Sequence, residues 1–297
     1  MAFGAGVENI VGLVLGRGLG LSMIGIVAGL LASVLVTRLL DVRTKVDSEI
    51  EPGGERRAVI ILLAAILSLF VIRFAGASDE TRWLSSLLEL MGLDWLAGRL
   101  RYALEGSPRS RMNHLVYWAL WRIVGYVILP VLVIRGLLGE RVSDFGLSLR
   151  GTWPYGRFYL LLLLGIAPVV VLASFHPEFQ ARYPFYMLIE GESLWPVFWI
   201  WEVLYALQFV SLEFFFRGFI LHGLSRRFGY MAILVMMVPY MMIHFQKPGL
   251  EAFGSIIAGF VLGTLALVGR SIWWGALAHV SVALSMDLLA VWHRGLL

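Results

Sequence analysis

The sequence predicts an all-α, polytopic integral membrane protein with about eight transmembrane helices and an interfacial amphipathic helix. Three observations favour this fold class. Hydrophobic residues make up 59% of the 297 positions and charged residues only 15%, whereas soluble domains average roughly 45–50% and about 25%. The mean hydropathy is +0.82. The apolar residues also gather in segments near the ~20 residues that a helix needs to cross a bilayer.

The composition excludes several classes of protein. The chain contains no cysteine, which excludes disulfides, thiolate nucleophiles and cysteine-ligated metal sites. The net charge of +4 fits basic loops that face anionic lipid headgroups. We therefore expect the lipid bilayer, and no nucleic acid, as a partner.

Apolar segments of spanning length recur along the whole chain. The first is too long for the core of a signal peptide and lacks a small-residue cleavage site, so we expect it to be retained. A polar loop with a Pro-Gly-Gly break follows it. The expected spans are residues 20–39, 58–75, 114–138, 158–174, 194–217, 231–245, 253–268 and 272–292.

Residues 78–113 differ from the expected spans. Apolar residues recur there at three- and four-residue spacing between charges, which is typical of an amphipathic helix. Trp83 and Trp95 suit a position at headgroup level. A packed helix outside the membrane is the alternative, and we favour the interfacial position.

Glu213 and Arg217 are the first candidate functional pair, because ionisable residues within spans are costly and often functional. Their four-residue spacing places both side chains on one helix face. They can form an ion pair that only neutralises itself, or a catalytic carboxylate that the arginine orients. The spacing leaves both interpretations open.

His244 and His279 lie in the same third of the chain. A single histidine in a membrane is more often an interhelical hydrogen-bond donor than a catalyst. Two histidines near a Glu–Arg pair favour a catalytic role more than one histidine does, because imidazoles can stabilise an oxyanion or hold a water molecule. We expect Glu213, His244 and His279 to converge in a water-filled cavity.

Other ionisable residues have simpler explanations. Asp287 lies about 12 Å along the helix from His279 and cannot contact it directly. Glu251 falls in the first turn of a helix, where the dipole favours a carboxylate. Arg122 and Glu202 are a candidate buried ion pair.

Four ordered motifs carry a resemblance to a known family. They are E-F-F-F-R-G-F, a histidine that closes the next span, K-P-G-L-E, and the stretch S-I-W-W-G-A-L-A-H with its later Asp. Together they resemble the CPBP (Abi) family of intramembrane glutamic endopeptidases, which includes the CAAX prenyl endopeptidases. The resemblance covers about residues 202–290. The form E-F-F-F-R-G / H / K-P-x-x-E / H-x7-D resembles a bacterial branch, which implies the bacterial inner (cytoplasmic) membrane.

The sequence departs from the family pattern at two positions. Leu212 stands where the first motif, Glu-Glu-x-x-x-Arg, has its first glutamate. Ala283 stands where the third motif, His-x-x-x-Asn, has its asparagine. The second motif, an aromatic residue followed by a histidine four positions later, is met by Tyr240 and His244. Asp287 is a candidate to replace part of the role of the missing asparagine.

The resemblance implies a glutamate-type hydrolase that requires neither cofactor nor metal. A metal held by His244, His279 and an acidic residue is the weaker alternative. Glu213, assisted by His244, would activate a water molecule that attacks a peptide carbonyl. His279 would stabilise the oxyanion, and Arg217 would orient Glu213. Residues expected to support this site are Asp287, Glu251 and Tyr240.

The resemblance also implies a division of the chain and a substrate. Residues 1–153 would form the N-terminal spans and the peripheral segment, and residues 154–297 the CPBP-type core of one integral domain. Because two motifs depart from the prenyl-protease form, we expect cleavage near the C-terminal tail of a membrane-tethered protein. A non-catalytic peptide-binding, immunity or scaffold protein of the same family is the main alternative. A transporter with a proton relay is a weaker one, since no inverted repeat is visible.

Overall fold

The computed structural model describes residues 42–50, 53–76, 82–149, 152–188, 192–247 and 249–296. Throughout these ranges the regular structure is helical and contains no strand. One isolated antiparallel bridge joins Leu147 to Ser271. The prediction of an all-α polytopic membrane protein is confirmed.

Within the described residues, six helical stretches are long and apolar enough to cross a membrane. The predicted first span, residues 20–39, lies outside the described residues, and the expected count of eight is not confirmed. The six stretches are Glu55–Phe74 (α3), Ser110–Leu138 (α6 to η4), Trp153–Ser174 (α8), Val197–Met242 (α10 to α12), Glu251–Gly269 (most of α13, Gly249–Gly269) and Trp273–His293 (α14).

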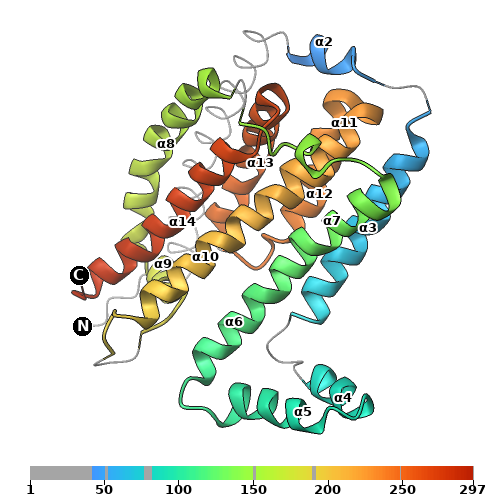
Figure 1. Ribbon diagram of the computed structural model, residues 1–297. Helices are drawn as coiled ribbons and strands as arrows, with labels where there is room; N and C mark the ends of the chain where they lie inside the picture. Colours follow the sequence, from blue (N-terminus) through green and yellow to red (C-terminus); the bar gives the residue numbers. More distant parts are fainter. Residues whose placement is uncertain are drawn as a thin grey trace, which may run out of the picture.

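The stretch Val197–Met242 covers most of the predicted fifth and sixth spans, residues 194–217 and 231–245. It begins with α10 (Val197–Glu213), continues through the π-helix η6 (Phe214–His222) and α11 (Gly223–Phe228), and then changes direction at Gly229. Gly229 has a φ of +53°, a conformation that glycine adopts far more readily than other residues. α12 (Ala232–Met242) then packs along η6 and against α13 (Figure 1).

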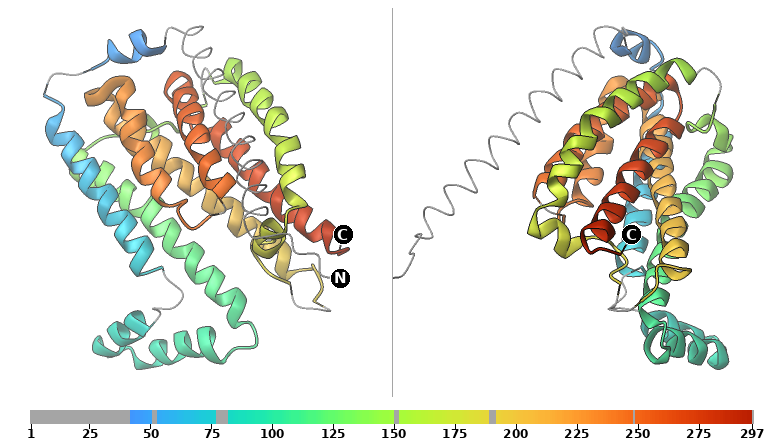
Figure 2. Two further views of the ribbon diagram at one scale, coloured as in Figure 1. Left: turned by 180° about the vertical axis from the view of Figure 1, so that it is seen from behind. Right: turned by 90° about the vertical axis from the view of Figure 1, so that its left-hand side faces the viewer.

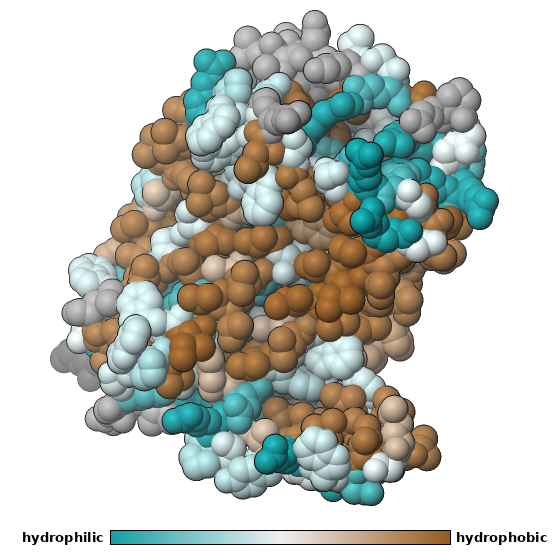
Figure 3. Space-filling view, viewed as in Figure 1, coloured by the Kyte–Doolittle hydropathy of each residue, from teal (hydrophilic) through white to brown (hydrophobic). Residues whose placement is uncertain are grey.

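The surface of the bundle is consistent with a membrane environment. An apolar belt crosses the molecule, and the hydrophilic residues lie mainly towards its two ends (Figure 3). α8 is the least buried of the six stretches, and Figure 2 shows it along the outside of the bundle beside α14. Hydrocarbon chains can cover such an apolar surface without the free-energy cost that water would impose.

The predicted amphipathic segment forms two short helices rather than one. These are α4 (Arg82–Leu90) and α5 (Asp94–Arg101), which lie across the lower end of the bundle in Figure 1. The break falls at Gly92, which has a φ of +74° that a helix cannot contain. Leu90 and Trp95 are 85% and 64% exposed, and the interfacial position of this pair of helices stays a prediction.

The main hydrophobic core surrounds η6. Phe215, Phe216 and Phe219 are fully buried. They belong to one cluster with Ile61 of α3 and with Tyr126 of the π-helix η3 (Val124–Ile128), which lies within the second helical stretch. The segment that carries the Glu–Arg pair is therefore enclosed by helices from both halves of the chain.

A bidentate ion pair ties α3 to the end of η4 (Val133–Leu138). Arg57 Nε donates to Glu140 Oε1 at 2.8 Å, and Arg57 Nη2 donates to Glu140 Oε2 at 3.0 Å. Arg57 also donates to the carbonyl of Gly223 in α11. The hydrogen bond from Arg57 holds the pKa of Glu140 below its ordinary value of 4.5.

We expect Glu140→Gln to lower thermal stability at neutral pH, because Arg57 then loses its charged partner. A folded-state pKa below the unfolded one means that ionised Glu140 stabilises the fold above pH 4.5. That contribution disappears as the pH falls through the folded-state pKa. Thermal unfolding in detergent across this range should therefore show a difference that shrinks on acidification. A pH-independent difference would contradict the prediction, and the exposed Glu105→Gln is the matched control.

Candidate active site

Glu213 and Arg217 lie at the centre of the candidate site. Glu213 is the last residue of α10, at the junction with η6, and both side chains are completely buried. Arg217 Nη1 lies 3.0 Å from Glu213 Oε1. π-Helical insertions are often found at functional sites. The predicted pairing on one helix face is therefore present, in the most enclosed part of the bundle.

His279 of α14 contacts the same carboxylate. Its Nδ1 lies 2.8 Å from Glu213 Oε1, and its ring lies 4.6 Å from that of Phe209. The His279 side chain is 18% exposed, whereas Glu213 is fully covered. The carboxylate therefore contacts a second group besides Arg217, and it joins α10 and η6 to a partly exposed histidine of α14. The expected water-filled cavity stays a prediction.

The second oxygen of Glu213 is unengaged. Oε2 is buried and has no hydrogen-bond partner among the described residues. Gly275, one turn before His279, allows this oxygen to approach α14, since a Cβ there would lie only 3.2 Å from Oε2. Sequence analysis missed Gly275, although its four-residue spacing from His279 was a usable signal. A carboxylate oxygen without a donor is costly unless a ligand supplies one.

His244 follows α12 and is oriented by its own helix. Its Nδ1 lies 2.8 Å from the carbonyl oxygen of Tyr240, and the two rings are 4.8 Å apart. Burial is the main cause that lowers the pKa of His244 to about 4, so the imidazole is neutral at neutral pH. The carbonyl can only accept, so Nδ1 carries the proton and Nε2 keeps its lone pair.

Tyr240 connects this histidine to the buried ion pair. The Arg217 guanidinium lies 4.1 Å from the centroid of the Tyr240 ring, which is a cation–π contact. The Tyr240 ring therefore contacts both His244 and the Arg217 guanidinium, which is paired with Glu213. Glu213, Arg217 and His279 are in direct contact, and His244 is linked to them through Tyr240. Their catalytic roles stay predictions.

Glu251 belongs to a polar cluster at the end of the bundle near His244. It lies 2.8 Å from Lys247 Nζ and accepts a hydrogen bond of 2.8 Å from the hydroxyl of Tyr183. Burial and the Glu251 carboxylate raise the pKa of Tyr183, so this hydroxyl remains a donor. Tyr183 follows α9 (Pro177–Arg182), and no sequence pattern indicated it.

Asp287 holds the loop after α9. It is completely buried, and its carboxylate accepts from the backbone N–H of Phe185 at 3.0 Å. The carboxyl group of Glu202 is its neighbour. The expected ion pair between Arg122 and Glu202 is absent from the described part of the chain, because Arg122 lies 3.4 Å from the ring centroid of Trp118.

No group of three or more His, Asp or Glu side chains suited to a metal ion is present among the described residues. The donors that meet at Glu213 are one carboxylate, one guanidinium and one imidazole. Arginine cannot serve as a metal ligand while it remains protonated. The geometry is that of a carboxylate in an ion pair with a guanidinium and in a hydrogen bond with an imidazole.

A helical membrane bundle with a buried carboxylate shared by an arginine and a histidine is an arrangement suited to hydrolysis inside a membrane. Residues 193–285 match the family model described as type II CAAX prenyl endopeptidase, Rce1-like. This match confirms the resemblance to the CAAX protease (CPBP) family over that segment, and it supports an integral membrane protease in general terms. It includes Glu213, Arg217, His244 and His279, and it does not test the bacterial-branch motif form. No curated protein and no solved structure matches the chain.

We expect Arg217→Met to destabilise the fold by roughly 3–5 kcal/mol, because it leaves a buried carboxylate without its guanidinium. The double variant Glu213→Gln/Arg217→Met removes both charges and should recover part of that loss. Thermal unfolding of the purified variants in detergent measures both effects. A double variant no more stable than Arg217→Met would contradict the pairing.

Proposed function

We propose that this protein is an intramembrane endopeptidase in which Glu213 acts as the general base. The observation that carries the proposal is the Glu213 carboxylate itself. Arg217 and His279 both contact Oε1, at 3.0 and 2.8 Å. Oε2 has no partner within the described structure, and it is the atom that would take a proton from the attacking water.

His244 would assist by holding that water. Its Nδ1 is engaged by the Tyr240 carbonyl, so the lone pair on Nε2 is available to accept a hydrogen bond. Because the imidazole is neutral at neutral pH, it does not repel the proton that leaves the water. Arg217 would orient Glu213 and favour its ionised form.

His279 would stabilise the oxyanion that forms on the scissile carbonyl. Its Nδ1 donates to ionised Glu213, so donation to the oxyanion falls to Nε2. Both nitrogens must then carry a proton, which makes His279 an imidazolium during the attack. Glu213 accepts a proton from the attacking water, and Glu213 can then pass that proton to the leaving amine.

The proposed substrate is a membrane-tethered protein cleaved near its C-terminal tail. Leu212 and Ala283 replace two polar groups of the prenyl-protease motifs, and both are buried in apolar clusters. The site of this chain is therefore less polar than the family pattern, which favours a different substrate from a prenylated one. The absence of the motif glutamate and asparagine at positions 212 and 283 also supports the alternative, a non-catalytic peptide-binding, immunity or scaffold protein.

Terminal-peptide mass spectrometry of host cells tests the proposal directly. Cells carrying wild type are compared with cells carrying Glu213→Gln at equal expression. A glutamine keeps an oxygen for His279 but cannot act as a base, so cleavage should fall by about 10²–10⁴-fold. New protein ends that vanish in the variant would identify the substrate. Identical profiles would favour the non-catalytic alternative, provided that size-exclusion chromatography shows both proteins folded.

We expect Gly275→Ala to impair cleavage without unfolding the protein. The added methyl group would lie about 3.2 Å from Glu213 Oε2, in the space that the attacking water needs. The rate should fall by roughly 10-fold or more, since catalysis is sensitive to displacements of about 1 Å. Gly254→Ala on α13 is the matched control, because a Cβ at that position meets nothing within 4 Å. Equal rates in the two variants would exclude Oε2 as the reacting oxygen.

A further inference from the structure

The chain between α9 and α10 begins with a short strap, residues 183–185, that lies against α10 and α14. The Tyr183 hydroxyl donates to Glu251 at 2.8 Å, and Arg294 donates to the Tyr183 carbonyl at 2.9 Å. The Phe185 N–H is shared by both carboxylate oxygens of Asp287, at 3.0 Å each. Two carboxyl groups and one guanidinium therefore fasten the strap to the bundle.

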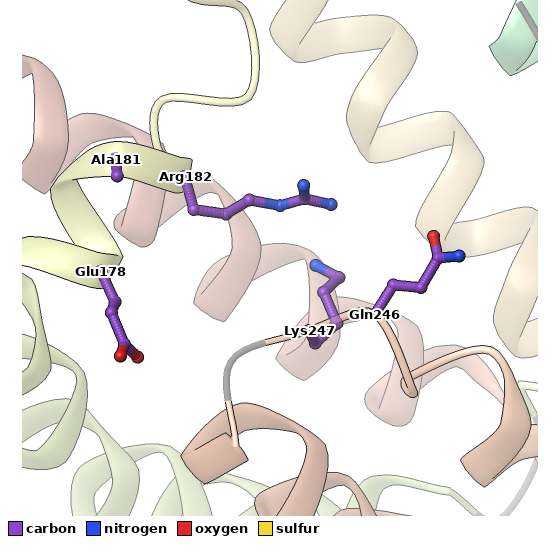
Figure 4. A pocket seen from close by; sticks show the side chains of 5 residues that line it. All are labelled: Glu178, Ala181, Arg182, Gln246 and Lys247. Atoms are coloured by element: carbon purple, nitrogen blue, oxygen red, sulfur yellow. The ribbon is translucent and has the colours of Figure 1, made fainter.

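The first residue of the strap contacts the loop that carries His244. Lys247 Nζ donates to the Tyr183 hydroxyl at 3.3 Å, and the Lys247 N–H donates to the His244 carbonyl at 3.0 Å. The strap follows directly after an open pocket between α9 and this loop, whose lining residues are Glu178, Ala181, Arg182, Gln246 and Lys247 (Figure 4). Water can therefore reach this end of the strap.

The last residue of the strap covers a row of aromatic side chains on α10. The Phe185 ring stacks on that of Tyr205, 5.2 Å away. The Tyr205 ring lies 4.7 Å from that of Phe209, which lies 4.6 Å from the His279 ring. Tyr205, Phe209 and Glu213 recur every four positions and so lie along one side of the helix. The strap therefore covers the row of side chains that leads to the candidate site.

Glu202 is the neighbour of the carboxylate that fastens Phe185. Glu202 is 5% exposed and Asp287 is completely buried, and their carboxyl groups lie side by side. Neither oxygen of Glu202 has a hydrogen-bond partner among the described residues. An ionised carboxyl group can only accept hydrogen bonds, whereas a protonated one also donates. A proton on Glu202 would therefore make it a donor to Asp287.

The cations around this pair are engaged elsewhere. They are Lys247, which pairs with Glu251 at 2.8 Å, Arg294, which donates to strap and α9 carbonyls, Arg182 over the Phe185 ring and Arg122 over the Trp118 ring. The phenols of Tyr183 and Tyr205 are the other titratable neighbours. Neither Glu202 nor Asp287 joins an ion pair within the described ranges. Adjacent buried carboxylates without a counter-ion repel each other, which favours the uptake of one proton.

We propose that Glu202 and Asp287 bind one shared proton, and that this proton keeps the strap closed. When the proton leaves to water, two adjacent carboxylates remain in a buried place. Hydrating both charges requires water, and displacement of Phe185 from Asp287 admits it. The strap then opens beside the loop of His244 and uncovers the aromatic row that contacts His279. This inference does not depend on catalysis, because a peptide-binding protein would contain the same strap.

Amide hydrogen exchange of the full-length protein in nanodiscs tests the proposal. Mass spectrometry follows the peptide that contains Phe185 from mildly acidic to mildly alkaline pH. Each rate is compared with that of the same peptide in unstructured form at the same pH. In the wild type, protection should fall as the pH rises, by at most about 10-fold per pH unit, which is the limit for one proton. A peptide from α3 should keep its protection and so report that the bundle stays folded.

Three variants separate the shared proton from a merely structural contact. Glu202→Gln should keep the strap protected at alkaline pH, because its amide donates to Asp287 and has no proton to lose. Asp287→Ala should leave the strap unprotected at every pH, because the Phe185 N–H loses its acceptor. Glu178→Gln, which changes a nearby exposed glutamate of α9, is the matched control and should retain the wild-type profile.

Wild-type protection that does not change with pH overturns the shared proton. A pH dependence that survives Glu202→Gln, or that disappears in Glu178→Gln, overturns its assignment to Glu202. If Glu202→Gln does not fold, Asp287→Asn takes its place, since its amide oxygen still accepts from Phe185 and its profile should be independent of pH. Cleavage by a protein whose strap does not respond to pH refutes only this inference. A pH-dependent strap in a protein that cleaves nothing refutes only the protease.

Discussion

The structure depends on one buried charge, the carboxylate of Glu213. It is completely enclosed, and an isolated carboxylate in such a place would cost many kcal/mol. Arg217 from the next turn and His279 from another helix both contact Oε1. Because this charge is held by partners from two elements, α10, η6 and α14 must pack in a single register.

Much of this centre could be predicted from the sequence, because its key relations are local or carried by motifs. The four-residue step from Glu213 to Arg217 fixes a shared helix face wherever the helix lies. The histidines were identifiable because imidazoles are uncommon within apolar segments. The apolar lengths also predicted most of the spans. The two-helix form of residues 82–101 was harder to predict, because it depends on one glycine with a positive φ.

The polar contacts around the centre could not be predicted, because they join residues far apart in sequence. Tyr183 meets Glu251 across 68 positions, and Phe185 meets Asp287 across 102. Helix periodicity carries no information about such pairs. The expected pair of Arg122 and Glu202 is also a contact between distant positions. It rested only on the attraction of opposite charges within spans. The packing instead places Arg122 over Trp118 and Glu202 beside Asp287.

The departure at Leu212 follows from the packing around Glu213. Leu212 is 4% exposed and belongs to the apolar cluster that surrounds η6. A second glutamate there would be a further buried carboxylate next to Glu213, and burying it would be costly unless it gained its own ion pair and hydrogen bonds. With leucine at position 212, Glu213 is the only carboxylate of the motif, and it contacts the Arg217 guanidinium and the His279 imidazole. In the proposed mechanism the general base of this motif is therefore Glu213, and Oε2, which has no hydrogen-bond partner among the described residues, is the oxygen assigned to accept the proton.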